Sequence, residues 1–93
     1  MATLYKSNGV IIEVEPKNGE KFQLKELYEM LGCDTVERVF IKGIKTIMVV
    51  DECGKLRRRP FNQNAINIYH SCERMNAWEW IAGDALVCEN SQF

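Results

Sequence analysis

The chain has 93 residues, of which 46% are hydrophobic and 27% are charged, and its formal net charge is −1. This length predicts a single domain over residues 1–93, with enough apolar content for one packed core. The near-neutral charge excludes a general electrostatic attraction to nucleic acid or membrane, so such a role would need a local basic patch.

The cysteines and the N-terminal residues bear on compartment and cofactors. Cys33, Cys53, Cys72 and Cys88 lie 20, 19 and 16 positions apart, whereas zinc and redox sites use close pairs. The N-terminal residues form no signal sequence, and no apolar run approaches the ~20 residues of a membrane span. We therefore expect a cytoplasmic protein with reduced thiols, no metal, no cofactor and no membrane contact; a disulfide framework is the alternative.

The first third of the chain predicts a hairpin followed by a helix. Residues 3–5 and 10–15 are β-prone and are separated by an Asn-Gly pair, which is typical of hairpin turns. Residues 16–19 predict a second turn. An apolar stripe with helical spacing follows, ended by Gly32, and consists of Leu24, Leu27, Tyr28 and Leu31.

The chain is organised around residues 44–65, which contain its longest β-prone segment. Residues 36–41 and 44–51 predict a second hairpin. The uninterrupted apolar run 47–50 predicts the central strand of the sheet, covered on both faces. Residues 51–54 predict the turn after it, with an acidic start and a glycine end.

A second helix and a last strand complete the predicted fold. Pro60 disfavours helical geometry at the preceding arginine and so predicts an extended basic segment, and Asn62 is a strong N-cap candidate. The helix should end near 73–75, and residues 85–88 predict the last strand. The apolar stripe of this second helix consists of Ala65, Ile68, Tyr69 and Cys72. The order β-β-α-β-β-α-β predicts an α+β fold, one mostly antiparallel sheet with two helices packed on one face.

Several motifs, taken in order, carry a family resemblance. They are GVIIEVEPKNGEKFQLKELYEMLG, VERV, MVVDECGKL, a Pro-x-Asn-x-x-Ala helix start at residue 60, and Gly-Asp-Ala-Leu-Val at 83–87. The ordered set resembles a family of short phage and mobile-element proteins classed as a domain of unknown function of the DUF3846 type. The resemblance implies an accessory protein of a phage, plasmid or conjugative element, and it supplies no activity or catalytic residue. The chain departs from the family pattern at 57–59 and at the two tryptophans.

Catalytic groups are scarce in the sequence. His70 predicts a solvated helix face, because its spacing offers no partner for catalysis or metal binding. Asp51 and Glu52 point to opposite faces of a strand, so they cannot act on one atom, and they favour a turn. Cys53 has basic neighbours that could make its thiol reactive, and the alternative interpretation is an ordinary turn position. We expect no enzyme and no catalytic residue; enzymatic function would require a pocket that gathers His70 or Cys53 with a carboxylate.

The basic segment is the main candidate for partner or phosphate binding, and consists of Lys55, Arg57, Arg58 and Arg59. In an extended chain alternate residues share one side, about 6 to 7 Å apart, and could meet phosphates or carboxylates. Three interpretations remain open: a solvated edge that discourages strand addition, a site for an acidic protein, and a nucleic-acid site, against which the net charge argues.

Two tryptophans are a second candidate surface. Trp78 and Trp80 would share one face of an extended segment, as core or as a partner or homodimer interface. We expect a noncatalytic accessory protein that acts by binding another protein, for example a host or defence factor. The alternative is a nucleic-acid-binding module that uses the basic segment 55–59.

Overall fold

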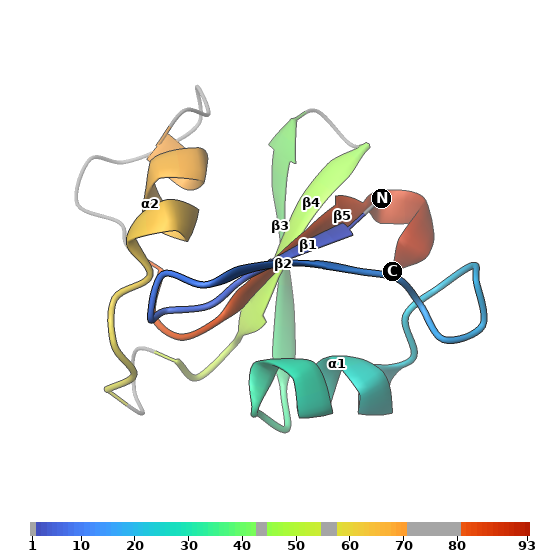
Figure 1. Ribbon diagram of the computed structural model, residues 1–93, viewed down its shortest axis with the longest axis horizontal. Coiled ribbons are helices and arrows are strands. Elements are labelled where there is room, and N and C mark those ends of the chain that lie inside the picture. Colours follow the sequence, from blue (N-terminus) through green and yellow to red (C-terminus); the bar gives the residue numbers. More distant parts are fainter. Residues whose placement is uncertain (1, 43–44, 55–57, 71–80) are drawn as a thin grey trace.

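The computed structural model describes residues 2–42, 45–54, 58–70 and 81–93 (Figure 1). It confirms the α+β fold and the order β-β-α-β-β-α-β, followed by a short 3₁₀ helix, η1. The elements are β1 (Ala2–Tyr5), β2 (Ile11–Val14), α1 (Leu24–Leu31), β3 (Val36–Lys42), β4 (Thr46–Asp51), α2 (Gln63–His70), β5 (Ala85–Glu89) and η1 (Asn90–Gln92). Neither described helix is long and apolar enough to cross a membrane.

The sheet has the strand order β2-β1-β5-β4-β3, and all its neighbouring strands are antiparallel. Both predicted hairpins are present, and β5 lies between them. The prediction that the 44–51 segment is the central strand was therefore wrong, because β5 is central and β4 lies beside it. An apolar run shows that both faces of a strand are covered, and it does not show how many strands lie on either side.

The two helices pack on opposite faces of the sheet, which corrects the prediction that both cover one face (Figure 1). Ile47 and Val49 of β4 join a core cluster with α1 residues, whereas Met48 and Val50 join a cluster with α2 residues. Side chains alternate between faces along a strand, so a fully apolar strand presents an apolar row on each face. Each row needs its own cover, and each helix supplies one.

The turn of the first hairpin and the end of α1 follow the predicted chemistry. The first hairpin closes with Lys6 N–H donating to Val10 O at 2.9 Å and Gly9 N–H donating to Lys6 O at 3.0 Å. Gly9 has φ +94°, the left-handed geometry that a three-residue hairpin loop needs at its last position. Gly32 ends α1 with φ +64°, as predicted. The stripe of α1 is narrower than predicted, since Leu24 is 54% exposed.

Candidate functional site

Loops from three parts of the chain meet where β4 ends, and we call this junction the clasp; its residues are Asp51, Arg59, Asn62, Gly83 and Asp84. Asp51 is 5% exposed. Its Oδ2 accepts a hydrogen bond from Arg59 Nε at 2.8 Å, and its Oδ1 accepts one from Cys53 N–H at 2.9 Å. Arg59 also donates through Nη2 to Gly32 O. The buried carboxylate therefore has a cation and a backbone donor, the pairing that burial of a charge requires.

Asn62 connects α2 to the rest of the clasp. Its Oδ1 accepts from Ala65 N–H at 3.1 Å, which confirms the predicted N-cap. Its Nδ2 donates to Tyr5 O at 2.7 Å and to Gly83 O at 2.9 Å. Asn62 is only 1% exposed. One amide thus holds the start of α2, the end of β1 and the loop before β5 together.

Asp84 fixes the same loop to the first hairpin. Its Oδ1 accepts from Ser7 N–H at 2.8 Å, and its Oδ2 lies 3.8 Å from Lys6 Nζ. Gly83 N–H donates to Pro60 O at 2.8 Å. These contacts could not be predicted from local sequence, because Ser7 and Lys6 are far from Asp84 along the chain.

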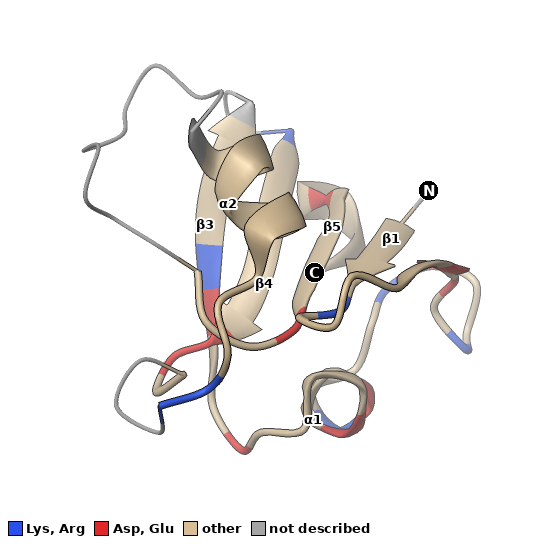
Figure 2. Cartoon of the chain, turned by 60° about the vertical axis from the view of Figure 1, so that its left-hand side comes forward, with Lys and Arg blue, Asp and Glu red and all other residues tan. Residues whose placement is uncertain are grey.

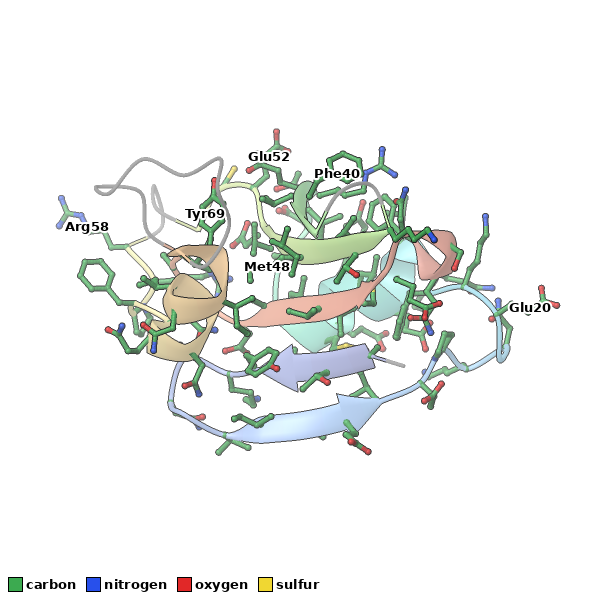
Figure 3. The ribbon with its side chains drawn as sticks, turned by 90° about the horizontal axis from the view of Figure 1, so that it is seen from above. Glu20, Phe40, Met48, Glu52, Arg58 and Tyr69 are labelled. Atoms are coloured by element: carbon green, nitrogen blue, oxygen red, sulfur yellow. The ribbon has the colours of Figure 1, made fainter. Side chains whose placement is uncertain are left out.

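The clasp changes the interpretation of the basic segment. Arg59 is engaged by Asp51 and Gly32, and its own N–H donates to Gly54 O at 3.1 Å. Arg58 has φ +54° and is exposed, so these two arginines do not continue the predicted extended row. Figure 2 shows the described part of the basic segment, in blue, close to the acidic end of β4, in red, and Figure 3 shows Arg58 pointing away from the body of the protein. Lys55 and Arg57 lie outside the described residues.

The structure brings together little that resembles an active site. Cys53 is half-buried, and its Sγ lies 3.8 Å from Thr35 Oγ1. Burial raises the pKa of the Cys88 thiol to about 11, so this core thiol stays protonated at neutral pH. Within the described part of the chain, no group of three His, Cys, Asp or Glu residues could hold a metal ion. The His70 side chain, Trp78 and Trp80 lie outside that part.

The two edges of the sheet differ in how they are protected. β3 shows a register shift between Phe40 and Lys42, and it carries Glu37 and Arg38. Arg38 is held over the rings of Phe40 and Phe93, with its Cζ 5.2 Å from each ring centre. Irregular register and charged side chains both hinder the addition of another strand.

β2 has few of these protections and is the outermost strand at the other edge (Figure 3). It pairs in regular register with β1, and Glu13 is its one charged residue. Ile11 is 55% exposed, and its neighbours Val10 and Ile12 are 46% and 41% exposed. We call residues 10–14 the open edge. The run of three successive apolar residues is visible in the sequence, but the basic segment was the main candidate for partner binding.

Comparison with known proteins identifies the family. The model of a domain of unknown function, DUF3846, matches residues 4–92. The chain belongs to the DUF3846 family. No curated protein and no solved structure matches it. In this DUF3846 protein the match includes both the clasp and the open edge, and the motif residues at 51, 62, 83 and 84 are engaged in the clasp.

Proposed function

We propose that this DUF3846 protein is a noncatalytic accessory protein of a phage or other mobile genetic element that acts in the cytoplasm by binding another protein through the open edge. The observation that carries the proposal is the exposure of three successive apolar residues, Val10, Ile11 and Ile12, at a sheet edge that has few protections. These side chains lie on both faces of the edge, where a partner strand could cover them, and an open edge offers backbone groups for strand addition.

The polar groups of the clasp support a structural role over catalysis. Asp51, Asn62 and Asp84 each hold separate segments of the chain together. A catalytic carboxylate needs access to a substrate atom, and Asp51 is almost fully buried and paired. The nucleic-acid alternative is weakened in the same way, because Arg59 is committed to Asp51 and Gly32.

The test is affinity purification from bacterial lysate with Ile11→Lys and a matched control, Leu24→Lys. The two leucine-sized side chains are 55% and 54% exposed, so either substitution places a charge on a similarly accessible apolar site. We expect a protein that is captured equally by the wild type and Leu24→Lys, and at least tenfold less by Ile11→Lys, in quantitative mass spectrometry. Circular dichroism checks that both variants fold. Repeated purifications without such a protein, or equal capture by all three baits, would contradict the proposal.

A further inference from the structure

The pairing of β1 with β2 shows which backbone groups face the open edge. Lys6 N–H donates to Val10 O, so these two residues form a hydrogen-bonded pair. Hydrogen-bonded and non-hydrogen-bonded pairs alternate along an antiparallel ladder. The register then places Ile12 in the next hydrogen-bonded pair, while the N–H and C=O groups of Ile11 and Glu13 point away from β1. The open edge therefore presents two residues able to pair with a further strand.

A hollow of about 420 Å³ lies where this edge approaches α1, on the face that α1 covers. Its apolar floor is formed by Val14 and Met30, and its rim carries Glu15, Glu29 and Lys17. Glu26 also lines it, but the Glu26 carboxylate accepts hydrogen bonds from the N–H groups of Lys17 and Gln23 at 3.0 and 3.2 Å. The exposed carboxylates of Glu15 and Glu29 thus outnumber the single ammonium on the rim.

We propose that the bound segment of the partner is an extended strand that pairs with the open edge and places an arginine or lysine in this hollow. The inference rests on the proposed function and names its partner chemistry. The aliphatic stem of a long basic side chain fits the floor of Val14 and Met30, and its head reaches the carboxylates of Glu15 and Glu29. The two neighbouring side chains of the segment that lie beside Ile12 and Ile11, one on each face of the sheet, would be apolar.

A second copy of the chain fits this edge poorly. Antiparallel pairing of β2 with itself brings together two strands that carry the same acidic residues, Glu13 and Glu15. Residues 10–16 contain no lysine or arginine to enter the hollow. A partner of different sequence satisfies both the backbone groups and the charge.

The experiment selects displayed random decapeptides on the full chain and measures binding of the enriched peptide by fluorescence polarisation. We expect the enriched peptides to carry neighbouring apolar residues and one arginine or lysine. Glu13→Pro removes the outward N–H but no hydrogen bond to β1, and should weaken binding at least tenfold, whereas Glu13→Ala should change it less than threefold. Glu29→Gln should weaken the basic peptide about tenfold and leave its norleucine analogue unchanged.

The outcomes separate this inference from the proposed function. Enriched peptides without a basic residue, or binding that Glu13→Pro leaves intact in a folded protein, would overturn the inference. The proposed function would still stand if Ile11→Lys abolished capture of a cellular protein. Sedimentation showing a dimer that Glu13→Pro converts to a monomer would assign the edge to a second copy, and would also overturn it.

Discussion

Arg58 and Arg59 are identical neighbours with different surroundings. Arg58 is exposed, whereas the Arg59 guanidinium neutralises a carboxylate whose side chain is 1% exposed. Removing one partner of such a pair leaves the other charge buried without compensation, which costs more than the pair itself contributes.

We expect Arg59→Ala to lower the free energy of unfolding by about 2 to 3 kcal/mol, a value reduced for the partial exposure of Arg59. Arg58→Ala should change it by less than about 0.5 kcal/mol, because alanine and arginine share the same backbone restriction at φ +54°. Urea denaturation of both variants gives the comparison. Similar losses would show that Asp51 does not depend on Arg59. If Arg59→Ala is strongly destabilising, it cannot serve as a test of nucleic-acid binding, and Arg58 has to be substituted instead.

Sequence reasoning at this scale succeeded for contacts within a few residues. Asp51 was predicted to form a turn, and its Oδ1 does accept from Cys53 N–H two residues later. Its contact with Arg59 and the contact of Arg59 with Gly32 O were not predictable, since they depend on how β4, α1 and the following loop come together. Local hydrogen bonds follow from residue type, whereas long-range ones follow from packing.

At the scale of elements, the Asn62 side chain makes one contact that was predictable from the sequence and two that were not. The oxygen caps α2, which the sequence predicted, and the nitrogen donates to carbonyls 57 and 21 residues away, which it could not. The types and order of the five strands and of α1 and α2 were predictable from periodicity and turn residues, whereas η1 was not predicted. The position of β5 in the sheet was not predictable, because local sequence does not encode strand order. The apolar run 47–50 did indicate cover on both faces, but it did not show that the two helices supply one cover each.

We expect Asn62→Ala to destabilise the protein by about 3 kcal/mol, from the lost cap and two buried carbonyls left without this donor. Asn67→Ala is the matched control, since Asn67 is an exposed asparagine of the same helix that accepts from Gln63 Nε2. Its effect should stay within about 0.5 kcal/mol. Thermal and urea unfolding measure both. If the two alanine variants were equally stable, the clasp would not depend on the Asn62 amide.

For the molecule as a whole, β4 contributes side chains to both core clusters, one on each face of the sheet. Val49 lies in the α1 cluster and pairs with Leu86 of the neighbouring strand β5, which lies in the same cluster, whereas Met48 lies in the α2 cluster. Substitutions in contact with one another should be coupled in free energy, and substitutions separated by the sheet should add.

Two double-mutant cycles test this arrangement by urea denaturation. Val49→Ala with Leu86→Val should show a coupling free energy of about 0.5 to 1 kcal/mol, because both remove volume from the same packed site. Val49→Ala with Met48→Leu should show less than about 0.3 kcal/mol, although these residues are adjacent in sequence, because their side chains lie in different clusters. Equal coupling in the two cycles would mean that the faces are not independent, and that the helices do not cover separate cores.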